Sequence, residues 1–177
     1  MKYVAVPKSA EPGSYGLKVL TPGPQTTMQD LGRIGYQALG VPISGELDGF
    51  SLRLGNALVG NPPGTAAFEI LHSGPSFEVI ADTVRVAVAG IGASLAIEGE
   101  RGRIVAAWQS VTLSCGKVFQ IVLGPDSVCA YLAVEGGIAV PSVLGSASTY
   151  LRAGLGGFEG RSLRQGDLVP LAIERGS

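Results

Sequence analysis

Polar side chains that could do chemistry are concentrated in three segments where glycine and proline recur. These segments are 26–33, 40–56 and 146–161. Loops of demanding conformation that carry hydroxyl, amide, carboxylate and guanidinium groups are suited to binding a small polar ligand. We therefore expect a ligand site built from these segments. The candidate binding residues are Gln29, Arg33, Ser44, Asp48, Asn56, Ser146, Ser148, Thr149 and Arg161.

Arginine and carboxylic acid side chains set the chemistry expected of this site. A guanidinium can hold a carboxylate through two parallel hydrogen bonds, which gives that role to Arg33 and Arg161. Asp30 and Glu69 are the candidate catalytic residues, because a carboxyl group can move a proton. Asp48 has a second interpretation as the residue that begins a helix. A competing structural interpretation is that Asp30 and Arg33 form an ordinary salt bridge while the hydroxyl groups satisfy turns.

Several common sites do not fit the sequence. The single histidine, His72, cannot build a multi-histidine metal site, and we expect no metal. Residues 90–95 carry two of the three glycines of a dinucleotide fingerprint but end in Leu95. Residues 114–117 end like a phosphate loop but lack its upstream glycine. No covalently bound cofactor is expected either.

Charge and hydropathy limit the partners and the location. The net charge of -1 and the pI of about 5.8 lack the basic excess that nucleic-acid binding needs. No apolar run reaches the roughly 18–20 residues of a membrane span. Residues 1–16 lack the basic start and apolar centre of a signal peptide. Cys115 and Cys129 lack the spacing of a redox pair and are expected to be reduced core residues. We expect a cytoplasmic protein that binds neither nucleic acid nor membranes.

Short runs of alternating apolar and polar residues recur along the chain and predict β-strands. Glycine, at 27 of 177 residues, suits the turns between them because it accepts positive φ. The pattern predicts a mainly β domain, either a barrel or a sandwich. The predicted strands are 17–20, 76–80, 84–88, 94–98, 104–108, 110–113, 118–123, 128–134 and 167–171.

One segment has helical periodicity instead. Apolar residues spaced i, i+3, i+4 and i+7 predict one conspicuous helix near residues 47–59. Asp48 or Ser44 would cap its start, and the Gly-Asn-Pro-Pro run at 60–63 would end it. Gly55 weakens this helix by up to about 1 kcal/mol relative to Ala unless close packing compensates. We expect a loose N-terminal leader over 1–16, a single β-rich domain over 17–173 and a tail over 174–177.

The polar segments also carry a family resemblance. Three of the motifs are Thr-Thr-Met-Gln-Asp-Leu-Gly-Arg at 26–33, Gly-Val-Pro at 40–42 and Gly-Gly-Phe-Glu-Gly-Arg at 156–161. With further matches in the same order across 17–171, the chain resembles the N-terminal half of a family that comprises biotin-dependent carboxyltransferases and the C-type subunit of 5-oxoprolinase. That family includes KipA-like and allophanate hydrolase subunit 2-type proteins. Met28 departs from the family pattern, which has valine there.

The resemblance implies a fold, a reaction and partners. The implied fold is a cyclophilin-like β-barrel. The implied reactions are carboxyl transfer from carboxybiotin to urea and ATP-dependent opening of 5-oxoproline. The sequence has no biotin attachment motif, so carboxybiotin would arrive on a separate carrier, and ATP would be used by a partner subunit. The implied partners are a KipI-like protein, which is the B-type subunit of such assemblies, and the missing C-terminal half of the family, or further copies of this chain.

Three functions are compatible with these observations. The first is a half-subunit of such an assembly, which binds a small amide or carboxylate substrate. The second is a non-catalytic protein-binding or regulatory module of the KipI-antagonist type. The third is an orphan domain from a split gene that binds an unrelated small metabolite.

Overall fold

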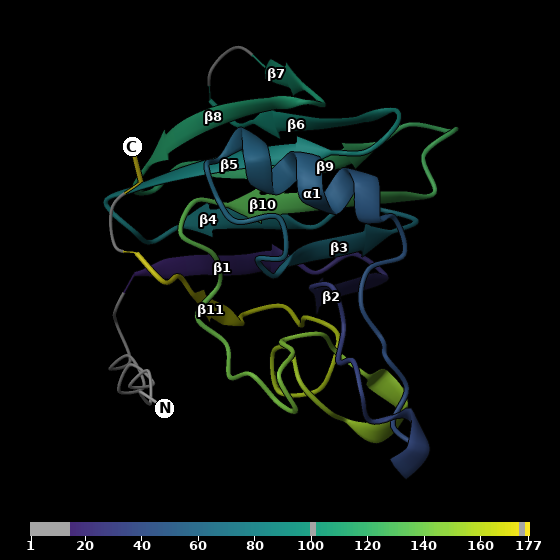
Figure 1. Cartoon of the computed structure of the whole chain (residues 1–177). Coiled ribbons are helices and arrows are strands. Elements are labelled where there is room, and N and C mark those ends of the chain that lie inside the picture. Colours follow the sequence, from purple (N-terminus) through teal and green to yellow (C-terminus); the bar gives the residue numbers. More distant parts are fainter. Residues whose placement is uncertain (1–14, 100–101, 174–175) are drawn as a thin grey trace.

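The described part of the chain folds into two antiparallel β-sheets and one α-helix (Figure 1). The computed structural model describes residues 15–99, 102–173 and 176–177. The expected leader therefore lies outside the described residues except for Tyr15 and Gly16, and the expected tail lies outside them except for Gly176 and Ser177. Gly176 donates its backbone N–H to the Thr83 carbonyl oxygen (2.9 Å), so this part of the tail is bonded to the domain.

The first sheet has the strand order β11-β1-β4-β9-β6-β7, and the second has the order β2-β3-β10-β5-β8. Every neighbouring pair in both sheets is antiparallel. The strands are β1 (Gly16–Thr21), β2 (Gln25–Gln29), β3 (Ala67–Leu71), β4 (Ser76–Val79), β5 (Thr83–Ala89), β6 (Ala93–Ile97), β7 (Arg103–Ala106), β8 (Gln109–Ser114), β9 (Val118–Leu123), β10 (Cys129–Val134) and β11 (Leu168–Pro170). Two short 3-10 helices, η1 (Gln37–Leu39) and η2 (Leu151–Ala153), lie in the connecting segments.

The main core lies between the two sheets, where apolar side chains from both inner faces meet. Phe68 of β3 packs against Phe77 of β4, with ring centroids 5.2 Å apart, and Phe77 also contacts Phe119 of β9 at 5.5 Å. Offset and tilted aromatic pairs of this kind add to the free energy of apolar burial. These rings join the second sheet to the first.

The prediction of a mainly β fold with one helix near 47–59 is confirmed. All nine predicted strands are present, with their ends within about two residues of the prediction. The two sheets are not closed into a barrel. Two strands were missed: β2, which the sequence placed in a loop, and β3. Cys115, expected in the core, is exposed, while Cys129 is half-buried, and neither forms a disulfide.

Helix α1 (Gly49–Leu58) lies across the outer face of the second sheet and packs on β5 and β10 (Figure 1). Its Leu52 enters a second, smaller core with Tyr131 and Ala133. A side chain at Gly55 would place a Cβ 3.3 Å from that of Ala89 and 3.5 Å from that of Ala133. Glycine therefore allows the helix to approach the sheet closely, which offsets its low helix propensity. Within the described part of the chain, no helix is long and apolar enough to cross a membrane.

Asp48 begins α1, as predicted. One carboxylate oxygen accepts the backbone N–H groups of Phe50 and Ser51, each at 3.1 Å, and the other accepts the Ser51 hydroxyl at 2.5 Å. Burial works to raise the pKa of Asp48, but these hydrogen bonds outweigh it and hold the pKa below its ordinary value. The first turn of the helix thus depends on an ionised side chain.

Replacing Asp48 with Ala should lower the free energy of unfolding by about 1 kcal/mol, because the helix loses its N-cap. Asp48→Asn, which keeps an acceptor oxygen, should lose less. Since the pKa of Asp48 is depressed, its contribution should be present at neutral pH and vanish as the pH falls through that pKa. Urea denaturation of the three proteins at neutral and acid pH checks this. An undiminished difference between wild type and Asp48→Ala at acid pH would contradict the capping role.

Candidate functional site

The Asp30 carboxylate joins the end of β2 to the segment 146–148. Its Oδ1 accepts the Ser146 hydroxyl at 2.6 Å and the Ser148 hydroxyl at 2.5 Å, and also the Gly32 backbone N–H at 2.8 Å. Its Oδ2 accepts the Ala147 backbone N–H at 2.6 Å. Burial favours the neutral acid, yet these four hydrogen bonds prevail and lower the pKa of Asp30. Asp30 is therefore a charged structural clamp at the site.

Arg33 is buried beneath the same segment, with 0% of its surface exposed. One terminal nitrogen, Nη2, donates to the Ser148 carbonyl oxygen. The Nε and Nη1 groups have no hydrogen-bond partner among the described residues. The structural interpretation of the sequence expected a salt bridge between Asp30 and Arg33, and this salt bridge is not formed. That interpretation also expected hydroxyl groups to satisfy turns, and those of Ser146 and Ser148 do so. Gly156 lies directly over the guanidinium, since a Cβ there would come within 2.7 Å of Nη2.

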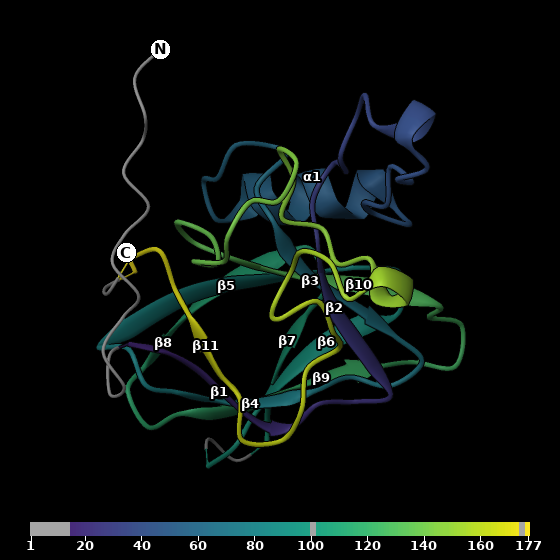
Figure 2. The same cartoon turned by 90° about the horizontal axis from the view of Figure 1, so that it is seen from below.

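Beside this clamp lies a pocket of about 330 Å³, which we call the polar pocket. Strand β2 lines it through the alternate residues Gln25, Thr27 and Gln29, and the segment 149–152, which is hydrogen-bonded to β2 at Thr149, lines it as well. Figure 2 shows the long connection between β10 and β11, coloured green to yellow, lying next to β2. The pocket brings together four of the predicted site residues, which are Gln29, Ser44, Glu69 and Thr149.

The side-chain amide of Gln29 has hydrogen-bond partners for its nitrogen but none for its oxygen among the described residues. Its side-chain Nε2 donates to the Thr149 carbonyl oxygen (3.2 Å) and the Thr27 hydroxyl (3.1 Å). Because a carbonyl oxygen can only accept, the amide must face Thr149 with its nitrogen. The Oε1 atom is left buried without a partner among the described residues. A buried acceptor of this kind is costly unless a ligand or water donates to it.

Glu69 lies on β3 at the back of the polar pocket and is buried. Its Oε2 accepts the Tyr131 hydroxyl and the backbone N–H of Leu47 (2.8 Å). The Tyr131 oxygen in turn accepts the backbone N–H groups of Leu47 (2.9 Å) and Asp48 (3.1 Å). Burial, assisted by the charge of Glu46, raises the pKa of Glu69 in spite of these hydrogen bonds. A carboxyl group with a raised pKa keeps its proton to higher pH, which suits it to proton exchange with a ligand.

Other predicted site residues lie away from the polar pocket. Asp48 caps α1. Asn56 is buried and donates to the Thr65 carbonyl oxygen at 2.7 Å, which fixes the loop after the helix. Arg161 holds the Asp167 carboxylate with two nitrogens, at 2.7 and 2.9 Å. Ser146 and Ser148 serve the Asp30 clamp. None of these residues lines the polar pocket, and a carboxylate-binding role of Arg161 stays a prediction.

Sequence reasoning missed several residues of the pocket. Gln25 and Thr27 share the outward face of β2 with Gln29, and their spacing of two residues could have identified it. Arg152, which also lines the pocket, had no motif to point to it. Tyr131, which contacts Glu69 behind the pocket lining, was not predicted as a site residue, because a buried hydroxyl contact is not visible in a sequence.

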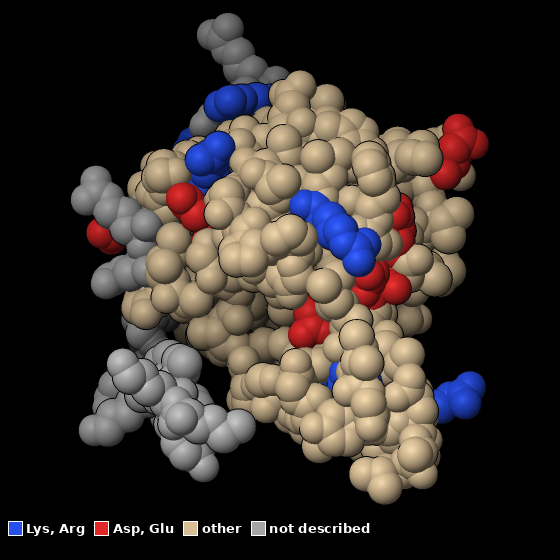
Figure 3. All heavy atoms as spheres, viewed as in Figure 1, with Lys and Arg blue, Asp and Glu red and all other residues tan. Residues whose placement is uncertain are grey.

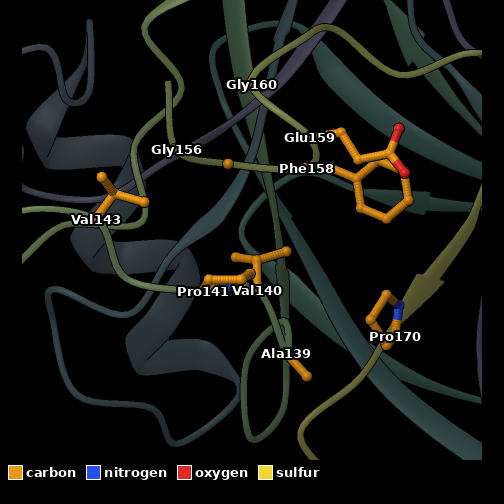
Figure 4. Close-up of a pocket in the computed structure, with 10 residues that line it drawn as sticks. Ala139, Val140, Pro141, Val143, Gly156, Phe158, Glu159, Gly160 and Pro170 are labelled. Atoms are coloured by element: carbon orange, nitrogen blue, oxygen red, sulfur yellow. The ribbon is translucent and has the colours of Figure 1, made fainter. Parts of the chain in front are cut away.

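A second cavity, of about 340 Å³, lies on the other side of the glycine-rich segment 156–160. In Figure 4 Val140 and Pro141 lie opposite Phe158, with Pro170 at one side. Its lining is mostly apolar, so it offers few groups that could orient a small polar molecule. The polar pocket is the better candidate for the site. No three His, Cys, Asp or Glu side chains in the described ranges could hold a metal ion.

The fold and these motifs place the chain in a known family. Residues 39–177 match the carboxyltransferase domain, subdomain A and B, and the chain belongs to this family. It is 39% identical over 158 residues to urea amidolyase from Saccharomyces cerevisiae, covering 86% of this chain and 8% of that protein. It is 36% identical over 155 residues to the C subunit of 5-oxoprolinase from Escherichia coli, covering 88% of this chain and 49% of that protein.

Solved structures agree with these matches. The crystal structure of the K. lactis urea amidolyase superposes with a TM-score of 0.85 at 34% identity, covering 93% of this chain and 10% of that one. The Kluyveromyces lactis urea carboxylase structure gives the same TM-score and identity and is covered over 14% of its length. The resemblance found in the sequence is thus confirmed, and the chain corresponds to one part of larger proteins.

Replacing Asp30 with Asn should lower the free energy of unfolding by about 2 kcal/mol, because an amide N–H₂ would replace an oxygen that now accepts a backbone N–H. Its depressed pKa means that the wild-type advantage should be lost as the pH falls through that pKa. Urea denaturation at several pH values measures both effects. Asp82→Asn, at an exposed position, is the control and should change little. Equal stability of Asp30→Asn and this control would rule out the clamp.

Glu69→Gln should become progressively more stable relative to wild type as the pH rises. Because the pKa of Glu69 is raised in the folded protein, its contribution is complete at acid pH and is lost as the pH rises through that pKa. Denaturant titrations of both proteins from about pH 4 to about pH 8 test this. The exposed Glu98→Gln serves as the matched control and should follow wild type. A difference that stays constant with pH would show that Glu69 titrates normally.

Proposed function

We propose that this chain is a component of a biotin-dependent carboxyltransferase or ATP-dependent 5-oxoprolinase type assembly, and that its polar pocket binds the small amide or carboxylate substrate. Family membership supports the class of assembly. The observation that carries the site is the pocket that Gln29, Ser44, Glu69 and Thr149 line together, with the Oε1 of Gln29 buried and unpaired beside it. An acceptor without a partner favours a ligand that brings N–H donors, which both urea and 5-oxoproline possess.

The pocket residues divide into binding and proton-transfer roles in this proposal. Gln29 accepts an N–H group of the substrate through Oε1. Ser44 and Thr149 orient the ligand, and Arg152 attracts a carboxylate if the substrate has one. Glu69, with its raised pKa, exchanges a proton with the substrate.

The Asp30 clamp acts on this site indirectly. Asp30 and Arg33 hold the segment 146–148, and Thr149 follows it directly into the pocket wall. Arg33 is completely buried and does not line the pocket, so its role in the proposal is to position Ser148 rather than to touch substrate. Asp30 is likewise a positioning residue.

Other proteins would supply the remaining parts of the reaction. The carboxyl donor would arrive as carboxybiotin on a separate carrier, or ATP would be used by a partner subunit. A KipI-like protein and a C-terminal half like that of the relatives are the proposed partners. No residue of this chain is assigned to carboxybiotin or to ATP.

A second candidate function is a non-catalytic protein-binding or regulatory module. The observation that favours it is the projecting segment 34–45, which contains no charged residue and exposes Ile34 and Leu39. Exposed apolar side chains on a projecting loop suit a protein contact. The two candidates differ in whether the polar pocket binds a small molecule.

Isothermal titration with 5-oxoproline and with urea tests the pocket. At least one should bind wild type, and Gln29→Ala should bind it about tenfold more weakly because the ligand N–H loses its acceptor. Gln120→Ala, an exposed glutamine on β9, is the matched control and should bind like wild type. Thermal unfolding confirms that each variant is folded. Absence of binding by both compounds, or unchanged binding by Gln29→Ala, would reject this site.

A further inference from the structure

Four large apolar side chains are exposed together where α1 begins. Leu47, Phe50, Ile91 and Val128 have exposed fractions of 66%, 70%, 74% and 71%. They come from three separate segments: the start of α1, the turn after β5 and the loop before β10. We call these four residues the apolar patch. Leu47, Ile91 and Val128 line one cavity, and exposed apolar side chains gathered in this way mark a place where another molecule binds.

The apolar patch surrounds a cavity with an acidic rim. The cavity measures about 270 Å³ and is lined by three members of the patch together with Asp48, Asp126 and Cys129. Among the described residues that line it there is no lysine or arginine. The nearby Arg53 faces Glu46 at 3.6 Å, so its charge is already matched. Figure 3 shows acidic atoms on the side of the molecule where α1 begins.

The charge of Asp48 in this rim is fixed by its role in the helix. Its hydrogen bonds from Phe50 and Ser51 favour the ionised carboxylate. A ligand that covers the cavity must therefore tolerate or complement negative charge. An uncharged apolar ligand would strip water from the carboxylates without replacing it.

We infer that the apolar patch binds a segment of a partner protein that presents an aliphatic or aromatic side chain flanked by lysine or arginine. The apolar side chain fills the cavity between Leu47, Ile91 and Val128. The flanking cations lie against Asp48 and Asp126. Buried apolar anchors with complementary charges at the rim are the usual organisation of a protein contact.

A second copy of this chain fits the apolar patch poorly. A two-fold symmetric contact would place the same surface on both sides. The Asp126 and Asp48 carboxylates of one copy would then face those of the other. Like charges brought together at an interface oppose binding, so the charge pattern favours a different, basic partner.

The apolar patch lies apart from the polar pocket. None of its four members lines that pocket, although the Leu47 backbone N–H donates to Glu69. Ile91 and Val128 have no contact with the proposed substrate site, and they are therefore the positions to change. This inference holds whether or not the polar pocket binds an amide.

Trp108 gives a direct signal for the experiment. It is the single tryptophan of the chain, and its ring centroid lies 6.2 Å from that of Phe50. Its fluorescence emission should therefore change when a peptide covers the patch. The probe is the blocked tetrapeptide Lys-Leu-Leu-Lys, with Glu-Leu-Leu-Glu and Lys-Ser-Ser-Lys as controls.

Lys-Leu-Leu-Lys should shift the emission saturably, and the two control peptides should not. Ile91→Ser and Asp126→Asn should each weaken this binding by about fivefold, because one removes an anchor and the other a rim charge. Ile104→Ser, which removes an equally exposed isoleucine on β7 (68% exposed), should bind like wild type. Val128→Ser replaces Ile91→Ser if that variant does not fold.

Three outcomes would overturn the inference. The first is no saturable response to Lys-Leu-Leu-Lys. The second is equal binding of Lys-Ser-Ser-Lys, which would show attraction by charge alone. The third is a wild-type dimer in light scattering that Ile91→Ser converts to a monomer, which would show that a second copy covers the apolar patch.

Discussion

The arrangement of the candidate site depends on one ionised carboxylate. Asp30 accepts four hydrogen bonds from the segments that follow β2 and β10, which are remote in sequence. Without it, the hydroxyl groups of Ser146 and Ser148 would have no charged acceptor, and the hydrogen bonds of Thr149 with Met28 and Gln29 would be left to hold this segment beside β2. Because charge-assisted hydrogen bonds are stronger than neutral ones, one side chain can hold two loops. The pocket wall thus depends on the hydrogen bonds to Asp30 together with those that join Thr149 to β2.

The surroundings of Glu69 shift its pKa in the opposite direction from that of Asp30. Asp30 receives enough donors to stay charged, whereas Glu69 is buried with fewer donors and close to another acid. Two carboxyl groups whose environments push their pKa values apart can take different tasks, one structural and one chemical. Tyr131 connects this chemistry to the helix, since its hydroxyl contacts Glu69 and the backbone at Leu47 and Asp48.

Local patterns in the sequence predicted what depends on local physics. The helix and its Asp48 cap followed from spacing and capping preference, and nine strands followed from alternation. Strand β2 was missed because its polar residues are buried by the segment around Thr149, a contact that no periodicity reveals. Strand β3 was missed because its first four residues are all buried, so apolar and polar residues do not alternate along it. The site was predicted as a set of residues, but Asp167 beside Arg161 could be found only in three dimensions.

The close approach of α1 to its sheet has a consequence for how the protein can change. Gly55 sits against Ala89 and Ala133, and these three small residues set the height of the helix above β5 and β10. A larger side chain at any of them would lift the helix and, with it, the Leu47 backbone N–H that reaches Glu69. Variation at positions far from the pocket would then alter the acidity of a residue inside it. In a mutant library that seeks new substrates, these three positions are best held constant while the pocket wall is varied, so that Glu69 keeps its acidity.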